Sequence, residues 1–159
     1  MKNKLLISVE DISLPPWLKN AENFIAELLE KRGHTDWELS VLFCSDALIR
    51  SLNREYRNVD AATDVLSFES GTRYTDENGD ERYLAGDIAV SVDFLYKNAR
   101  DFNVCPDEEL KRLLIHGILH LEGMDHGENH MGDAVYCEMI ALQEQLLTDF
   151  ISRTVIEEK

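Results

Sequence analysis

The pattern of hydrophobic and polar positions divides the chain into strands and helices. From Trp37 to Phe43 every second residue is apolar, which is typical of a strand with one buried face. Elsewhere apolar residues recur at intervals of three and four, the spacing of an amphipathic helix. The expected order is strand, helix, strand, helix, two strands and three helices. The expected strands are 4–9, 37–43, 63–68 and 83–92, and the expected helices are 17–32, 46–56, 93–103, 106–121 and 133–151.

This order predicts an α+β, or mixed α/β, fold. We expect residues 1–159 to form a single domain in which a small mixed β-sheet is packed by about five helices. Asp46 and Asp93 are the expected caps of the second and third helices. The polar stretch 69–82, which contains Asn78-Gly79, predicts a hairpin or a mobile loop.

Membrane association is not expected. No apolar run approaches the roughly 20 residues that span a bilayer. The short apolar run 5–9 ends at Glu10 without a cleavage pattern, so a first strand is favoured over a signal peptide.

The segment from Pro106 to Leu121 is the most apolar of the expected helices. A proline followed by acidic residues, 107–109, is typical of a helix N-terminus. The middle of the segment is apolar nearly all round, which predicts a buried helix in the centre of the domain.

Three of the five histidines, His116, His120 and His126, lie at the end of this segment. His116 and His120 are four residues apart and therefore leave the same face of a helix. Gly123 follows, and glycine readily adopts the left-handed turn that ends a helix. Past such a turn the chain can bring His126 back to the same point. Three imidazoles with open positions are typical of a catalytic zinc centre rather than a closed structural one.

The histidine spacing matches the H-E-x-x-H-x-x-G-x-x-H pattern of metzincin proteases with one departure. Gly117 stands where those proteases carry the glutamate that acts as general base. Histidines satisfied within the core are the alternative, but two imidazoles on an apolar helix are costly without a partner, which favours a metal. His130 and His34 are expected to be solvated surface residues.

Arg50, Arg54 and Arg57 lie at helical spacing and form one basic face if the segment is helical. An arginine facing the metal could clamp a phosphate. From spacing alone, an ordinary solvated face is favoured.

Gly86-Asp87 enters the expected fourth strand. One interpretation is a β-bulge with the Asp87 carboxylate turned inward to orient a histidine. A simple turn at the start of the strand is equally compatible with these residues.

The charge of the chain argues against broad nucleic-acid binding. The formal net charge is −15, whereas affinity for a polyanion comes mainly from Lys and Arg. A local basic cleft or a bound metal ion could still provide it. Cys44, Cys105 and Cys137 are odd in number and far apart, which predicts reduced core thiols in a cytoplasmic protein.

The chain carries three longer motifs: L-N-x-x-Y-R-x-x-D-x-x-T-D-V-L-S-F at 52–68, G-D-I at 86–88 and H-G-x-L-H-L-x-G-x-D-H at 116–126. Together they resemble the YbeY family of bacterial metal-dependent endoribonucleases. The stretch 141–144, Ala-Leu-Gln-Glu, also fits the last helix of that family. Met124 and Ala85 are minor departures, and the acidic loop 74–81 could adapt substrate access in this member.

The resemblance implies a single-strand-specific endoribonuclease with a zincin-like metal site on the buried central helix. It implies His116, His120 and His126 as ligands of one Zn²⁺ or another divalent ion, and Arg57 with His116 as catalytic residues. It also implies a role in ribosomal RNA processing, notably at the 3′ end of the small-subunit RNA, and in ribosome quality control. The implied partners are ribosomal RNA, the ribosome or its small-subunit proteins, and other RNA-processing factors.

Two other functions stay open from the residues alone: a metal-dependent peptidase, and a ribosome assembly factor whose metal is only structural. No side chain stands out as a general base. The attacking group is therefore either a water activated by the ion or the RNA 2′-hydroxyl, and these leave different product ends.

Overall fold

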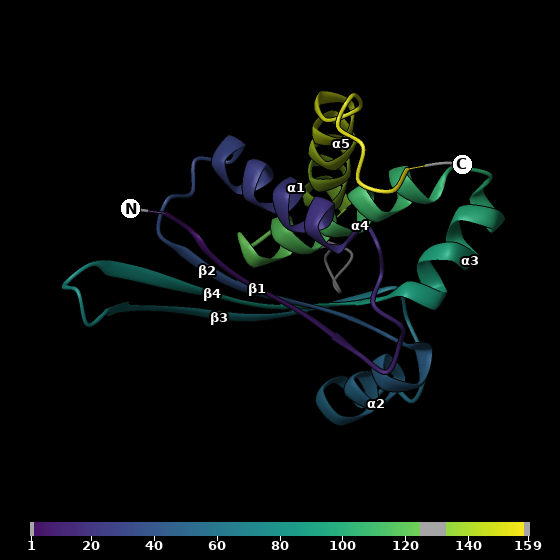
Figure 1. The fold of residues 1–159 in the computed structure, drawn as a ribbon, viewed down its shortest axis with the longest axis horizontal. Helices are drawn as coiled ribbons and strands as arrows, with labels where there is room; N and C mark the ends of the chain where they lie inside the picture. The colour runs from purple at the N-terminus through teal and green to yellow at the C-terminus, as the bar shows by residue number, and fades with distance from the viewer. Residues whose placement is uncertain (1, 125–132, 158–159) are drawn as a thin grey trace.

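The computed structural model describes residues 2–124 and 133–157, and within them the chain forms nine helices and strands in the expected order (Figure 1). The elements are β1 (Lys4–Glu10), α1 (Leu18–Lys31), β2 (Trp37–Cys44), α2 (Asp46–Arg57), β3 (Val65–Thr75), β4 (Glu81–Ser91), α3 (Val92–Phe102), α4 (Pro106–Leu121) and α5 (Asp133–Asp149).

The four strands form one mixed sheet in the order β1-β2-β4-β3. β2 pairs in parallel with both β1 and β4, so that Val41 lies opposite Ile7 on one side and Ile88 on the other. β3 pairs antiparallel with β4 and places Leu66 opposite Ala89. The expected α+β domain with a small mixed sheet and five helices is therefore confirmed for the described residues.

The helices are divided unequally between the two faces of the sheet. Figure 1 shows α1, α4 and α5 above one face and α2 below the other. The larger core lies between the first face and its helices. A smaller cluster lies between the other face and α2 and consists of Cys44, Ile49, Leu66 and Ala89. No helix in the described part of the chain is long and apolar enough to cross a membrane.

α4 is the buried central helix that its composition predicts. Leu114, Ile115 and Ile118 are at most 1% exposed. Gly117 lets the helix approach the sheet, because a Cβ there would lie 2.9 Å from Cδ1 of Ile88 on β4. The helix ends at Leu121, and Gly123 follows with φ +96°, the left-handed conformation expected there.

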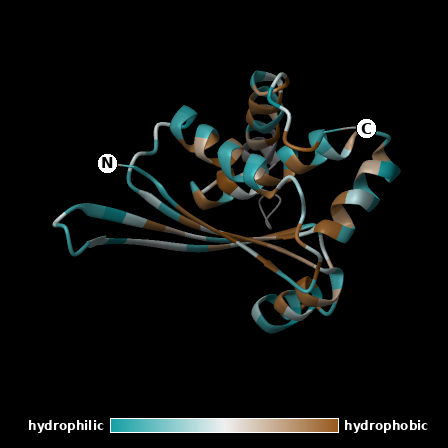
Figure 2. Ribbon diagram, in the orientation of Figure 1, coloured by the Kyte–Doolittle hydropathy of each residue, from teal (hydrophilic) through white to brown (hydrophobic). Residues whose placement is uncertain are grey.

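β3 and β4 extend much further into the polar stretch than the hydrophobic pattern indicates. The expected strand 63–68 continues to Thr75, and β4 begins at Glu81, so the stretch is a hairpin rather than a mobile loop. Gly79, with φ +83°, and Asp76 close the turn through a 3.0 Å backbone hydrogen bond. Figure 2 shows the outer hairpin in mainly hydrophilic to neutral colours. Backbone pairing holds it together with polar side-chain contacts to β2 and the residue before it, from Tyr74 to Glu38 and from Arg73 to Asp36 at 2.8 Å.

Serines rather than aspartates cap α2 and α3. The Ser45 hydroxyl accepts a hydrogen bond from the Leu48 amide, and the Ser91 hydroxyl accepts one from the Phe94 amide. The expectation that Asp46 and Asp93 are the caps is therefore wrong. The two aspartates instead join the two helices. The Asp93 carboxylate accepts a hydrogen bond from the Asp46 amide at 2.9 Å, and the Asp46 carboxylate accepts one from the Ser91 hydroxyl at 2.6 Å.

Candidate functional site

A hollow of about 480 Å³ opens where the C-terminal end of α4, the inner part of β3 and the last turn of α2 meet. It brings the first and third sequence motifs together, although they are some fifty residues apart in the chain. The described residues that line it are Arg57, Val65, Leu66, Ser67, Glu69, His116, His120, Leu121, Gly123 and Met124.

His116 and His120 lie one above the other on the wall of this hollow. Both side chains are half-buried, and their ring centroids are 4.9 Å apart at an interplanar angle of 74°. The expectation that they share one helix face is confirmed. His126 and His130 lie outside the described residues. Within 2–124 and 133–157, no three His, Cys, Asp or Glu side chains gather as a ligand set, so a ligand role for His126 stays a prediction.

The histidine pair fits a divalent metal ion by its chemistry. Imidazole nitrogen is a ligand that zinc prefers. The rings also stand at the C-terminal end of α4, where the helix dipole places negative partial charge and favours a cation.

Gln143 on α5 orients the first of these rings. Its Oε1 lies 2.6 Å from Nδ1 of His116, while its Nε2 donates to Glu144 at 3.2 Å. Because the amide nitrogen is engaged by the carboxylate, the amide oxygen faces the imidazole. In this arrangement a hydrogen on Nδ1 of His116 would complete the contact and leave the lone pair of Nε2 for a metal.

Of the two interpretations of Gly86-Asp87, the one in which Asp87 orients a histidine is not seen in the structure. The bulge at Gly86 is confirmed, with φ +142° and a shift in the pairing of β4 with both neighbours. A Cβ at Gly86 would lie 2.1 Å from the Phe68 carbonyl oxygen, so only glycine fits. The Asp87 side chain, however, is exposed, and the inward carboxylate is wrong. Gln143 makes the histidine contact that one interpretation gave to Asp87, and the 141–144 stretch was the available signal.

Arg57 ends α2 and projects into the same hollow as the two histidines. Its guanidinium donates to the Ser67 carbonyl and lies 5.3 Å from the centroid of the Phe68 ring. The side chain is exposed but held on two sides, which favours the phosphate clamp over an ordinary solvated face.

The three arginines of α2 do not act as one basic face. Arg50 forms a bidentate pair with Asp60 at 2.8 and 3.2 Å, which raises the pKa of Arg50 and lowers that of Asp60. Arg54 is exposed and does not line the hollow. Of these three arginines, only Arg57 therefore lines the hollow with His116 and His120.

Sequence reasoning missed Glu69, which is the only carboxylate among the described lining residues. Its position just after a family-like motif gave no signal of its own. The expectation of a solvated His34 is also wrong: its Nε2 lies 2.7 Å from Glu122, and its ring stacks on Trp37 at 3.9 Å. Cys44 is buried as expected, Cys105 is only half-buried, and neither forms a disulfide.

The family model described as Endoribonuclease YbeY matches residues 6–151. This match runs from β1 through α5 and includes every described residue of the hollow. The chain belongs to the YbeY family.

Relatives named Endoribonuclease YbeY are similar over nearly their whole length. One from Treponema denticola is 48% identical over 153 residues, covering 94% of this chain and 95% of the relative. One from Treponema pallidum strain Nichols is 45% identical over 145 residues, covering 91% and 88%. One from Borreliella burgdorferi strain B31 is 36% identical and covers 93% and 96%.

A solved structure supports the fold independently. The solution structure of TM1509 from Thermotoga maritima superposes with a TM-score of 0.61 at 27% sequence identity. The match covers 98% of this chain and 97% of the other, so the YbeY-family chain shares a whole fold with it rather than a local motif.

Proposed function

We propose that residues 1–159 form one metal-dependent endoribonuclease domain that cleaves single-stranded RNA during ribosomal RNA maturation. The observation that carries the proposal is that Arg57, His116 and His120 line one hollow in a YbeY-family chain. Relatives similar over more than nine-tenths of this chain carry the name endoribonuclease. The substrate we propose is ribosomal RNA, notably the 3′ end of the small-subunit RNA, with a further role in ribosome quality control.

His116, His120 and His126 would hold one ion, with Zn²⁺ favoured by the imidazole set. When bound, the ion would supply Lewis acidity toward a phosphoryl oxygen and toward water. The Gln143 contact supports this assignment, because it leaves Nε2 of His116 as the ligand atom.

Arg57 would hold the scissile phosphate. The guanidinium is positioned by the Ser67 carbonyl and the Phe68 ring before substrate arrives, so little conformational freedom is lost on binding. Glu69 lies in the same hollow and is the described side chain that could accept a proton from the attacking group. This gives the chain a candidate base that sequence reasoning lacked.

Gly117 counts against the peptidase alternative. The protease pattern needs a glutamate at this position, but the position faces β4, where even a Cβ would be 2.9 Å from Ile88. A carboxylate there would have to enter the core rather than the hollow.

The charge of the chain limits how RNA would bind. With a net charge of −15, a single arginine and a metal ion make a small basic site on an acidic body. We expect weak, strongly salt-dependent binding to bare RNA. This supports ribosomal proteins or other RNA-processing factors as partners, and a cytoplasmic location follows from that proposed role.

The test combines elemental analysis with cleavage of single-stranded RNA, with and without a chelator. We expect about one divalent ion per chain, cleavage that the chelator abolishes and that added Zn²⁺ restores. His116→Ala should lose both ion and cleavage. Arg57→Ala should keep the ion and lose about 100-fold in cleavage rate, the usual range for one charge-stabilising group.

The controls separate the remaining alternatives. Arg54→Ala removes an exposed arginine from the same helix and should cleave normally. Cleavage that persists in metal-free His116→Ala would refute the metal-nuclease assignment. A protein that binds the ion but never cleaves RNA would instead favour the assembly factor with a structural metal.

A further inference from the structure

We propose that Gln143 and Glu144 of α5 are positioning residues that select the metal-binding tautomer of His116. The inference rests on the proposed metal site, since a tautomer matters only if Nε2 of His116 binds an ion. It assigns a role to two residues on a helix that carries none of the expected ligands or catalytic residues.

The first step is the burial of the Gln143 amide. Gln143 is 5% exposed, so its amide cannot exchange protein partners for bulk water. Its Oε1 is 2.6 Å from Nδ1 of His116, and its Nε2 is 3.2 Å from Oε2 of Glu144. Each end of the amide therefore has one specific neighbour.

The second step is that Glu144 determines which way the amide points. In the opposite orientation, the buried amide oxygen would face a carboxylate oxygen, and two acceptors would meet without a hydrogen between them. The amide nitrogen would then face Nδ1 of His116 and require the lone pair there, which moves the hydrogen to Nε2. That tautomer cannot bind a metal through Nε2.

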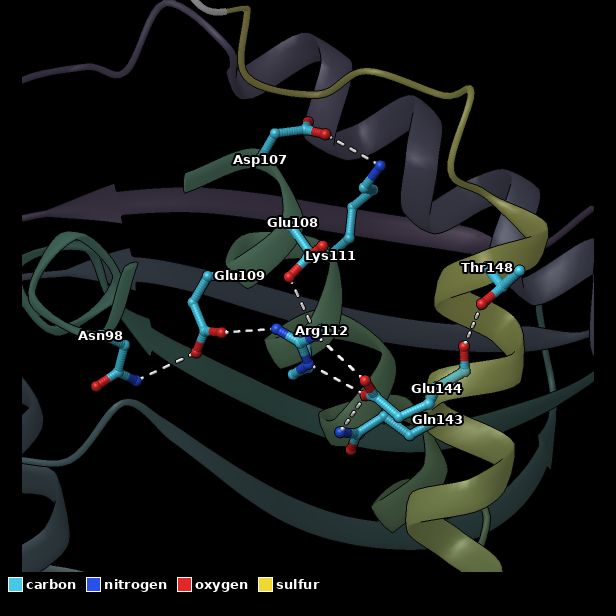
Figure 3. Close-up of polar contacts among 9 residues, drawn as sticks. All are labelled: Asn98, Asp107, Glu108, Glu109, Lys111, Arg112, Gln143, Glu144 and Thr148. Atoms are coloured by element: carbon cyan, nitrogen blue, oxygen red, sulfur yellow. Dashed lines mark hydrogen bonds and ion pairs between the residues drawn. The ribbon is translucent and has the colours of Figure 1, made fainter. Parts of the chain in front are cut away.

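The third step is that Glu144 is itself fixed. Nε and Nη2 of Arg112 on α4 each lie 3.1 Å from one of its carboxylate oxygens, a bidentate pair (Figure 3). The hydrogen bond from Arg112 holds the pKa of Glu144 below its usual range, so the carboxylate stays charged and remains an acceptor. Arg112 is anchored in turn by Glu108 and Glu109 on its own helix.

Together these contacts form a chain from Arg112 through Glu144 and Gln143 to His116. It begins and ends on α4, one turn apart along that helix, and passes through α5. The ligand orientation thus depends on how α5 docks against α4, a dependence that the histidine motif alone does not contain.

The test compares Gln143→Leu and Glu144→Gln with a matched control, Gln145→Leu. Gln145 is on the same helix and, among the described residues, donates only to the exposed Asp149. We would measure the Zn²⁺ dissociation constant by competition with a chromogenic chelator, and the thermal midpoint of each variant. Gln143→Leu should weaken Zn²⁺ binding about 10- to 100-fold, the usual effect of losing a partner of a ligating histidine. Glu144→Gln should weaken it less, and Gln145→Leu should not change it.

A second readout does not depend on the metal. In the metal-free native protein at about pH 8.5, where ordinary imidazoles are neutral, nitrogen NMR should show the hydrogen of His116 on Nδ1. Glu144→Gln should move part of the population to Nε2. Signals are assigned by their loss in His116→Gln.

Two results would overturn the proposal: a native His116 protonated on Nε2, or a Gln143→Leu variant that melts earlier but binds Zn²⁺ as tightly as Gln145→Leu. The second result would reduce Gln143 to a packing contact. A native protein that binds no metal would refute the proposed function instead, and the tautomer measurement would still decide this inference.

Discussion

In its first turns α4 buries Glu109 and Lys111, and in its last turns it carries His116 and His120. The first pair is 2% and 3% exposed, and the histidines are half-buried. Both halves of the helix thus place polar groups where apolar residues would be expected, at a cost in desolvation. They differ in what surrounds those groups.

The polar groups of the first half are satisfied within the protein. Nζ of Lys111 has three acceptors, Asp107 at 3.0 Å and the carbonyls of Phe150 and Arg153 at 3.2 and 2.9 Å, one for each of its hydrogens. Glu109 accepts from Asn98 and Arg112 (Figure 3). These contacts tie the helix to α3 and to the chain that follows α5.

The polar groups of the second half line the hollow that they share with Arg57. His116 has one contact of the first kind, with the neutral Gln143 amide, which orients the ring without adding charge. The comparison teaches that burial and charge alone do not identify a functional group. What distinguishes the halves is whether the side chain points into packed protein or into an accessible hollow.

His120→Ala tests most directly whether the two halves of α4 differ in function. We expect the variant to fold normally but to lose RNA cleavage by about 1,000-fold or more, since a ligand should matter more than the 10- to 100-fold of a ligand's partner. Single-turnover cleavage and circular dichroism measure the two effects. A variant that unfolds, or one that cleaves at the native rate, would place His120 with the structural residues of the first half.

Lys111→Met should give the opposite result. Removing the ammonium leaves Asp107 and two carbonyls without their donor, so we expect a loss of about 3 kcal/mol in the free energy of unfolding. The cleavage rate of the folded fraction should be unchanged. Urea unfolding followed by fluorescence gives the stability, and an assay below the transition gives the rate. A large loss of rate without a loss of stability would contradict a purely structural role.

The order of the elements followed from the sequence because most of them bury one face against the core. The outer part of the β3–β4 hairpin did not, because Arg73 and its polar neighbours are exposed and have no core to face. Backbone pairing with β4 forms that strand, and no hydrophobic alternation records it.

The candidate site divides in the same way. The shared face of His116 and His120 was predicted from spacing, because residues four positions apart lie on the same face of a helix. The inward orientation proposed for Asp87 was wrong because the bulge at Gly86 reverses the alternation of side chains between the two faces of the sheet. Ala85 and Ile88 both belong to the main core although three positions separate them, so Asp87 turns to the other face. Gln143 is on α5, and only the packing of α5 against α4 brings it near His116.

Gly117→Ala tests the contact that sets α4 against the sheet. The new methyl would lie 2.9 Å from Cδ1 of Ile88, so we expect a loss of about 2 kcal/mol in the free energy of unfolding by overpacking. Ile88→Val removes the nearest atom and should restore part of the stability in the double variant. A double-mutant cycle measured by urea unfolding gives the coupling free energy between positions 117 and 88. Strictly additive losses in the free energy of unfolding would mean that the two positions do not clash.

The smallest expected effect is a difference in pH dependence between the two ends of α4. Burial raises the pKa of Glu109, only partly opposed by hydrogen bonds from Arg112 and Asn98. Burial also acts to raise the pKa of Glu122, but hydrogen bonds from His34 and Arg32 outweigh it and hold that pKa below the usual 4.5. The two carboxyls should therefore affect stability with opposite signs.

For Glu109 the folded state binds the proton more tightly, so its contribution is complete below the unfolded pKa and is lost as pH rises through the folded pKa. For Glu122 the contribution is present above the unfolded pKa and is lost as pH falls through the lowered folded value. Free energies of unfolding for the native protein, Glu109→Gln and Glu122→Gln between about pH 3 and 6 separate the two. The native-minus-variant difference should fall with pH for Glu109 and rise for Glu122. Slopes of the same sign would show that the two ends of α4 do not differ in how they hold charge.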